Sequence, residues 1–521
     1  MKIKKNFIVL LALMAMLPMQ VFAQKRENNV ICDNEECVLA ILDKLNSQNP
    51  AVVDEGRKEI NDVVENVVYT LDVKEKTALK KSILLFVENN DKCSSNDYLF
   101  SLFPRFCYTT DVVDLYPWID NDNHGDAAIR AIGDIPETGD YISKYIIKNH
   151  DNLKHKAALA YAVGKQNVVQ MENELISWLD DADLSTKIEI YNALVVVRTN
   201  EKTTKIVEKG AKKLYNSKDV PTKIEGMKLL TAVKGEKSLS MLYKSLKNKD
   251  KRVQVAALDL LKPFANDKVC AKTVKICSKN GAVVEVLGWL GEIKNDSQME
   301  FVINQLSSQD PKVVEAAIRA VFNIDNPNGI AAVKPMFGGK YQEVIKEEMI
   351  KYEGDYFSVL NDVIRGNDKQ KLAVLQIIEE RPILETNRRV RELLNSGNPD
   401  VKDEAFKVLK YVVMPANADF LSALLENCDD KYVEDVQIAI KNAMANIPEA
   451  PKDDFVIKLK HVKPNIMPRF YKVFAYFGTE LSVSKLIEAY ESGDYKKQAK
   501  EALLLVENEA YKDRIAEVLK H

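Results

Sequence analysis

Apolar residues recur along most of the chain at the spacing of two short amphipathic helices joined by a polar turn. In one such pair, both segments place apolar residues on one helical face, and these residues are Met299, Val302, Ile303 and Leu306, then Val313, Ala316, Ala317 and Ala320. Residues three and four apart lie on the same face of a helix, so each segment predicts a helix with one buried face. The turns "SQDP" (308–311) and "SGNP" (396–399) predict Asp310 and Asn398 as N-caps, each followed by a proline in the first turn of the second helix.

This helix pair is repeated along the chain from about residue 120 to the C-terminus. "NKDKRVQVAALDLL" (248–261) is echoed by "SQDPKVVEAAIRAV" (308–321). Equivalent small or apolar positions recur about every 31 residues, and they are Ala128, Ala158, Ile190, Gly226, Ala257, Leu287, Ala317, Ile345, Ala373, Ala405, Ile438, Phe470 and Ala499. Helices of about 10 to 14 residues are marginal alone and gain stability by stacking. The pattern therefore predicts an all-α protein, a right-handed α-solenoid of about 13 to 15 antiparallel helix pairs.

Three regions follow from this pattern. Residues 1–23 read as a targeting segment, residues 24–115 as a divergent N-terminal helical cap in which the repeat is less regular, and residues 116–521 as the solenoid. The alanine pairs of the second helices are small, which lets one helix approach its neighbour closely. Gly288 and Gly291, in "GAVVEVLGWLGEI" (281–293), are interpreted in the same way as close-packing positions and a helix end.

Four stretches resemble HEAT repeats, in particular the short 30-residue kind grouped with phycobilisome-lyase-like repeats. They are "GDAAIRAIGDI" (125–135), "DKRVQVAALDLL" (250–261), "DPKVVEAAIRAV" (310–321) and "NPDVKDEAFKVL" (398–409). The resemblance covers about four fifths of the chain after residue 23 and implies an architecture rather than an activity. The family often has Arg where this chain has Gln254, Val314 and Lys402, so its Asp–Arg ladder is not expected here. Exported chains of this style are similar to bacterial proteins that accompany sugar-processing enzymes.

The first 23 residues have the three parts of a cleavable signal peptide. Lys2, Lys4 and Lys5 form a positive region, "FIVLLALMAML" (7–17) is an apolar core, and "VFA" (21–23) supplies small residues before Gln24. The apolar core is shorter than the roughly 20 residues of a membrane span, and a membrane anchor is the weaker alternative. We expect cleavage after Ala23 and a periplasmic or secreted protein without a transmembrane anchor.

Export permits disulfides, and the chain has seven cysteines. Cys32, Cys37, Cys93 and Cys107 are the candidates, and they allow three connectivities between which sequence does not choose. Cys270 and Cys277 are two helical turns apart, about 10 Å, which exceeds the reach of a disulfide and predicts buried apolar fillers. No CxxC occurs and the five histidines are scattered, so no metal site is predicted.

Charge is spread unevenly although the net charge is only −3. Residues 201–280 contain 20 Lys or Arg against 8 Asp or Glu, inside an otherwise acidic protein. The candidate binding residues form a basic stripe of Lys205, Lys209, Lys212, Lys213, Lys244, Lys247, Lys249, Lys251 and Arg252. Such a stripe attracts acidic proteins, polysaccharides or lipid headgroups, whereas a solvated lysine-rich face is the alternative interpretation.

The local sequence motifs give little indication of catalysis or of ligand binding. "DNDNHGD" (120–126) matches positions 1, 3 and 6 of a calcium loop but has Ala131 where a bidentate Glu is required, so a turn between helices is favoured. His150 and His155 are five apart, off the i, i+4 spacing of a zinc helix. The aromatic run "MPRFYKVFAYFG" (467–478) has helical spacing and is interpreted as core. No catalytic or cofactor motif is found, so no catalytic residue and no cofactor are predicted.

These observations favour a non-catalytic scaffold that presents a concave helical-repeat surface to another protein, one that is acidic or extended. A polysaccharide is the secondary partner, and nucleic acid is not expected because exposed aromatics are not interleaved with the basic residues. The alternative function is an enzyme, or an obligate accessory subunit of a carbohydrate-processing system, with a site in the solenoid groove.

Overall fold

The computed structural model describes residues 32, 34–493 and 495–520. All regular elements in these residues are helical. The chain forms two compact units, Met1–Ser240 and Met241–His521. The predicted signal peptide, residues 1–23, lies outside the described residues. The predicted boundary between a cap and a solenoid at residue 115 differs from this division and stays a prediction.

The first unit consists of successive helices joined by short turns. These are α2 (Glu35–Lys44), α3 (Pro50–Thr70), α4 (Val73–Asn89), α5 (Asn96–Phe106), α6 (Val112–Leu115), α7 (Gly125–Asp134), α8 (Gly139–Lys148), α9 (Lys156–Lys165), α10 (Glu172–Trp178), α11 (Leu184–Val197), α12 (Glu201–Tyr215) and α13 (Val220–Lys234). Short 3₁₀ helices extend several of them, and these are η1 (Thr109–Asp111), η2 (Tyr116–Trp118), η3 (His150–Asn152), η4 (Val169–Met171) and η5 (Gly235–Ser238).

The second unit continues the alternation after α14 (Leu239–Ser245), which begins at the boundary. Its helices are α15 (Lys251–Leu261), α16 (Asp267–Lys279), α17 (Val283–Glu292), α18 (Met299–Gln305), α19 (Pro311–Ile324), α20 (Pro327–Val333), α21 (Gln342–Lys351), α22 (Tyr356–Val363), α23 (Asp368–Glu380), α24 (Asn387–Leu393), α25 (Pro399–Leu409), α26 (Ala418–Asn427), α27 (Val433–Met444), α28 (Glu449–Lys458), α29 (Tyr471–Phe477), α30 (Glu480–Ser492), α31 (Lys496–Leu503) and α32 (Lys512–Val518). Its 3₁₀ helices are η6 (Lys262–Phe264), η7 (Asp296–Gln298), η8 (Lys334–Met336), η9 (Leu384–Thr386), η10 (Pro415–Asn417), η11 (Asp430–Tyr432), η12 (Leu459–His461), η13 (Met467–Phe470) and η14 (Glu509–Tyr511).

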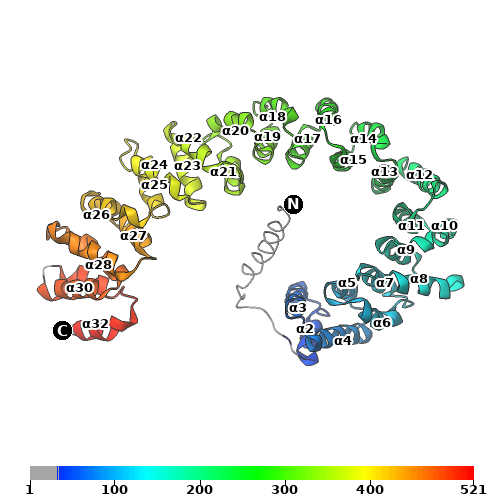
Figure 1. Cartoon of the computed structure of the whole chain (residues 1–521), viewed down its shortest axis with the longest axis horizontal. Helices are drawn as coiled ribbons and strands as arrows, with labels where there is room; N and C mark the ends of the chain where they lie inside the picture. The colour runs from blue at the N-terminus through cyan, green and yellow to red at the C-terminus, as the bar shows by residue number, and fades with distance from the viewer. Residues whose placement is uncertain (1–31, 33, 494, 521) are drawn as a thin grey trace, which may run out of the picture. The chain divides into compact units, whose positions relative to one another are not determined.

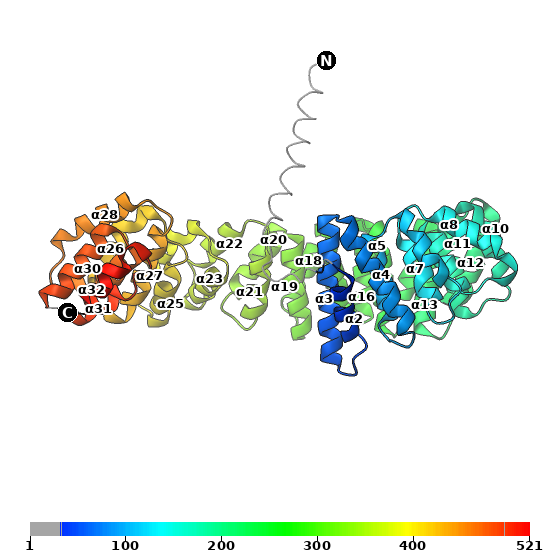
Figure 2. The same cartoon turned by 90° about the horizontal axis from the view of Figure 1, so that it is seen from below.

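Within each unit the helices form two layers. In the first unit α7 contacts α9, α9 contacts α11 and α11 contacts α13, and in the second unit the odd-numbered helices from α15 to α31 contact one another in the same way. The even-numbered first helices lie beside them as a second layer (Figure 1). In the second unit the colours follow chain order in both views, so neighbours in sequence are neighbours in space (Figure 2). This confirms the predicted α-solenoid of HEAT-like helix pairs, and the handedness of the stack stays a prediction.

The N-terminal ends of the second helices α19 and α25 are capped as their sequences predict. The Asp310 carboxylate accepts a hydrogen bond from the Lys312 backbone N–H at 3.0 Å, and the Asn398 side chain accepts one from the Asp400 N–H at 3.0 Å. Pro311 and Pro399 occupy the first helical turn, where a missing N–H costs nothing. Each cap therefore sets the start of a second helix and its rotation toward the core.

Small residues bring second helices close together at some predicted positions and not at others. A Cβ built on Gly133 of α7 would lie 2.8 Å from the Ala162 Cα of α9, and one on Gly291 would lie 3.3 Å from the Ala320 Cα of α19. The close-packing interpretation is therefore confirmed for Gly291. It is wrong for Gly288, where a Cβ would have nothing within 4 Å, because this residue points away from the neighbouring helices.

Hydrogen bonds from tyrosine to aspartate link successive helix pairs. The Tyr161 hydroxyl donates to the Asp134 carboxylate at 2.8 Å across 27 residues, close to one repeat. The other pairs of this kind are Tyr145 with Asp120, Tyr352 with Asp325, and Tyr432 with Asp403. Burial and the Asp134 carboxylate raise the pKa of Tyr161 to about 12, so the hydroxyl stays protonated and donates at neutral pH.

The structure pairs only two of the four candidate disulfide cysteines. Cys32 and Cys37 form a disulfide with their Cα atoms 5.5 Å apart, whereas Cys93 and Cys107 are buried free thiols. These two lie at opposite ends of the 11-residue helix α5. At 1.5 Å per residue that helix separates them by about 16 Å, well beyond the reach of a bridge. Cys270 and Cys277 are also buried and unpaired, as predicted.

No helix in the described part of the chain has the length and apolarity to span a membrane.

Candidate functional site

Four lysines of the predicted basic stripe lie on α12 of the first unit. The buried face of α12 consists of Thr203, Val207, Ala211 and Leu214. The lysines occupy the opposite, solvent-exposed face, and we call Lys205, Lys209, Lys212 and Lys213 the α12 patch. Because α12 is a first helix, this patch belongs to the first-helix layer rather than to the layer of second helices.

The remaining five residues of the stripe lie in the second unit around the turn between α14 and α15. Lys244 is in the last turn of α14, Lys247 and Lys249 are in the connecting turn, and Lys251 and Arg252 open α15. All five side chains are exposed. We call this set the α14–α15 patch. The stripe in the sequence therefore consists of two patches, one in each unit, with four residues on a first helix and five around the turn into a second helix. Binding of a partner at these patches stays a prediction.

Acidic neighbours already neutralise four of the nine residues. Lys205 and Lys212 pair with Glu201 and Glu208 one helical turn earlier, at 3.0 and 2.7 Å. Lys251 pairs with Glu285 at 2.8 Å, and Arg252 pairs with Asp250 at 2.8 Å. Exposed pairs of this kind contribute little to stability, but they do cancel charge locally.

Glu208 is the central acid of the α12 patch. Its carboxylate accepts from Lys212 at 2.7 Å and from Lys234 of α13 at 2.8 Å. These two side-chain hydrogen bonds hold the pKa of Glu208 at about 2. The glutamate therefore stays ionised over the whole physiological range and fixes Lys212 against the body of the repeat.

Five lysines of the two patches form no ion pair within the described residues. They are Lys209 and Lys213 on α12, and Lys244, Lys247 and Lys249 at the α14–α15 turn. All five are exposed. Their positive charge is available to a partner, which distinguishes them from the paired residues of the same stripe.

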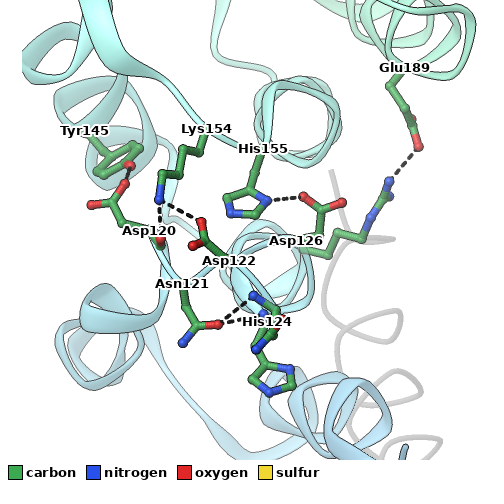
Figure 3. A network of polar contacts seen from close by, with 11 residues as sticks. Asp120, Asn121, Asp122, His124, Asp126, Tyr145, Lys154, His155 and Glu189 are labelled. Carbon is green, nitrogen blue, oxygen red and sulfur yellow. Dashed lines mark hydrogen bonds and ion pairs between the residues drawn. The ribbon is translucent and has the colours of Figure 1, made fainter. Parts of the chain in front are cut away.

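The motif at residues 120–126 is a structural turn. The Asn121 side chain accepts from the backbone N–H groups of Asn123 and His124, both at 2.9 Å, which closes the turn before α7 (Figure 3). Each carboxylate is bound by a side chain of the next repeat. Asp120 accepts from Tyr145, Asp122 from Lys154 at 2.7 Å, and Asp126 contacts the His155 Nδ1 at 2.7 Å (Figure 3).

The histidines do not converge on one site. His155 serves the Asp126 contact, whereas His150 pairs with Glu174 at 3.1 Å. The hydrogen bond to Glu174 raises the pKa of His150 above its usual range. Among the described residues, no three His, Cys, Asp or Glu side chains are grouped to hold a metal ion.

One cavity with charged residues of both signs bears on the alternative function as an enzyme. It has a volume of about 300 Å³, and its lining includes Asp325, Glu348 and Glu353 and also Lys294 and Lys351. Asp325 accepts from the Tyr352 hydroxyl, and Glu348 accepts from Arg319 at 2.9 Å. Two of the three carboxylates are thus engaged in holding helices together, and the enzymatic alternative stays a prediction.

A second cavity, of about 270 Å³, lies between α28, α29 and α30 and is mostly apolar. Sequence reasoning interpreted the aromatic run 467–478 as core, and Phe470, Phe474 and Phe477 are indeed buried. It missed the cavity that Met467, Tyr471 and Phe474 line. The only available signal was the unusually long connection between α28 and α29, which contains Pro464 and Pro468.

Comparisons with family models and with curated proteins give no match. Similar solved structures include Kap95p with RanGDP, at 11% identity over 93% of this chain and 79% of that chain, with a TM-score of 0.37. Importin beta is 12% identical over 98% and 82%, with a TM-score of 0.30, and UNC-45 from Drosophila melanogaster is 11% identical over 91% and 82%, with a TM-score of 0.25. With TM-scores below 0.5, these likenesses add nothing to the architecture shown by the helix pairs, which is a HEAT-like α-solenoid.

Proposed function

We propose that this chain is an exported, non-catalytic scaffold that binds an acidic partner protein through its two lysine patches. The observation that carries the proposal is the set of five exposed lysines that form no ion pair among the described residues and that lie within residues 209–249, inside the basic block of an otherwise acidic chain. Unpaired surface charge of one sign attracts a partner of the opposite sign and speeds its association.

The form of the two patches favours an extended or acidic polypeptide as the partner. Each patch lies on exposed helix faces and turns. Exposed lysines on such a surface suit a partner that supplies many carboxylates. Binding through exposed charges is screened within about 8 Å at physiological ionic strength, which predicts strong salt dependence.

A defined acidic probe tests the proposal. We expect a fluorescein-labelled poly-glutamate peptide to bind the full chain in fluorescence anisotropy at 50 mM NaCl, and to bind about tenfold more weakly at 300 mM. Lys209→Glu with Lys213→Glu disables the α12 patch, and Lys244→Glu with Lys247→Glu and Lys249→Glu disables the α14–α15 patch. Each set should weaken binding by at least about fivefold.

The matched control is Lys497→Glu with Lys500→Glu, which changes two exposed lysines of α31 that lie outside both patches. Binding that is insensitive to salt, or that falls equally in the control, would contradict the proposal. Dextran sulfate serves as the polysaccharide probe. If the protein binds dextran sulfate more tightly than poly-glutamate, the partner is a polysaccharide rather than a protein.

A further inference from the structure

The apolar cavity in the second unit arises from an irregular helix pair. α28 ends at Lys458 and α29 begins at Tyr471, and the connection between them contains η12 and η13. Other pairs use much shorter turns, such as 306–310 between α18 and α19. Leu459, Lys460 and Met467 of this connection line a space between α28, α29 and α30. This space has a volume of about 270 Å³ and is lined by Val456, Leu459, Lys460, Met467, Tyr471, Phe474, Lys485, Glu488, Ala489 and Ser492.

The floor of this cavity is formed by apolar side chains that are buried in the core. Val456, Leu459 and Phe474 are buried core residues that also face the cavity. Tyr471 and Phe474 lie one turn apart on α29, with ring centroids 6.4 Å apart. Ala489 of α30 contributes a small side chain to the wall. A large apolar group entering here would remove its own surface and that of the lining from water, which is favourable.

The rim of the cavity carries net positive charge. Lys460 is exposed and forms no ion pair among the described residues, whereas its neighbours Lys458 and His461 are engaged by Asp419 and Glu426. Lys485 pairs with Glu488 at 2.6 Å, so these two charges cancel. The remaining charge is that of Lys460, which selects a ligand with a carboxylate beside its apolar part.

We propose that this cavity is a docking site for an acidic peptide segment of a partner protein. One large apolar side chain of the segment fills the cavity, and an adjacent Asp or Glu contacts Lys460. The volume is below the usual range of about 300 to 1,000 Å³ for drug-sized ligands, so it suits a single side chain rather than a long lipid chain. The site lies apart in sequence from both lysine patches and does not depend on them.

The test selects peptides directly on the full chain. A random heptapeptide library displayed on phage is selected on the wild-type protein, and the enriched peptide is then synthesised with a fluorescent label. We expect enriched peptides to place Phe, Trp, Leu or Met next to Asp or Glu. Ala489→Trp, which fills the cavity, should weaken binding of the labelled peptide by more than about tenfold, and Lys460→Glu by at least about fivefold.

The control is Lys500→Glu, which changes an exposed charge that is not part of the cavity lining and should leave peptide affinity unchanged. Thermal melting checks that Ala489→Trp folds, and Lys460→Glu tests the site without a change in the core. Enrichment of peptides without an apolar–acidic pair, no enrichment at all, or equal binding to Ala489→Trp would overturn the proposal. If decanoate binds the protein and no peptide is enriched, the cavity binds free amphiphilic molecules and not a peptide segment. Loss of the lysine patches affects none of these readouts, so the two proposals fail separately.

Discussion

At the scale of single residues, Asp111 shows how a carboxylate links separate helices in the first unit. It forms ion pairs with Lys76 at 2.5 Å and Lys80 at 2.8 Å, both on α4, and it accepts from the Tyr108 backbone N–H at 2.8 Å. Burial alone would raise the pKa of Asp111, but the two lysines and the backbone N–H outweigh it and lower the pKa below 3.8. The ionised carboxylate is therefore part of the folded structure.

Because of Asp111, we expect the folded segment around α4 to lose stability in acid. Because its pKa is lower in the folded state, its contribution is fully present above about pH 4 and is lost as the pH falls through the lowered pKa. Asp111→Asn should reduce the free energy of opening of α4 and η1 at pH 7 by about 1 to 3 kcal/mol and flatten its dependence on pH below about 4. Hydrogen exchange at several pH values measures both effects. An unchanged pH profile in the variant would contradict this role.

At the scale of helices, arginines from a later helix pair hold the C-terminal ends of earlier helices. Arg381 donates to the carbonyl oxygens of Met349, Ile350 and Tyr352 at the end of α21 and lies over the Tyr356 ring at 4.2 Å. Arg469 donates in the same way to Leu425, Glu426 and Cys428 at the end of α26. A helix end leaves carbonyls without partners, and a cation there also opposes the negative end of the helix dipole.

Two glycines in second helices predict opposite effects of the same substitution. Gly133→Ala places a Cβ 2.8 Å from the Ala162 Cα, which pushes α7 away from α9 and should destabilise this contact by about 1 to 3 kcal/mol. Gly288→Ala meets open space within α17 and should stabilise that helix by up to about 1 kcal/mol, since alanine favours helix formation. Hydrogen exchange of α9 and α17 measures the two changes. Equal effects at both positions would argue against close packing at Gly133.

Sequence periodicity was sufficient for the elements and insufficient for the contacts between them. The caps at Asp310 and Asn398 and the buried positions Ala257 and Ala317 were predictable because they depend on residues within one repeat. Gly288 was misassigned because periodicity gives the face of a helix but not the distance to its neighbour. The sequence showed the lysine patches as a local excess of positive charge, whereas the ion pair between Lys251 and Glu285, 34 residues apart, could be found only in the structure.

The cavity of the second unit was beyond sequence reasoning for a related reason. Its walls come from three helices and a connection of irregular length, and its apolar lining residues have the sequence pattern of ordinary core positions. The Tyr–Asp pairs are an intermediate case. Their spacing of 25 to 29 residues is close to one repeat, so a search for polar pairs at that spacing would have found them.

At the scale of the whole molecule, the helix pairs suggest stability that is local rather than global. In a solenoid each repeat contacts only its neighbours, so a change in one repeat weakens mainly that repeat and the next. Gly133→Ala, in the first unit, should therefore leave hydrogen exchange in α25 to α31 of the second unit unchanged.

At the same scale, the proposed export would determine in which compartment the protein meets its partner. If the signal peptide is cleaved as proposed, the protein recovered from outside the cytoplasm begins at Gln24. Intact-mass measurement and N-terminal sequencing check this directly. Replacement of Ala23 with a large charged residue, Ala23→Arg, should block cleavage and leave a longer chain, whereas Ala40→Arg, well beyond the site, should not alter processing. A mature protein that retains Met1 would contradict export by this route.

The five buried thiols give the folded chain an unusual property. Cys93, Cys107, Cys270, Cys277 and Cys428 are spaced along both units, and burial raises the pKa of Cys107 and Cys277 to about 12. A thiol reacts as its thiolate, so these side chains are chemically silent until the surrounding helices open. The rate at which a thiol reagent modifies each cysteine therefore measures how often the helices around that cysteine open. No engineered label is needed for this measurement.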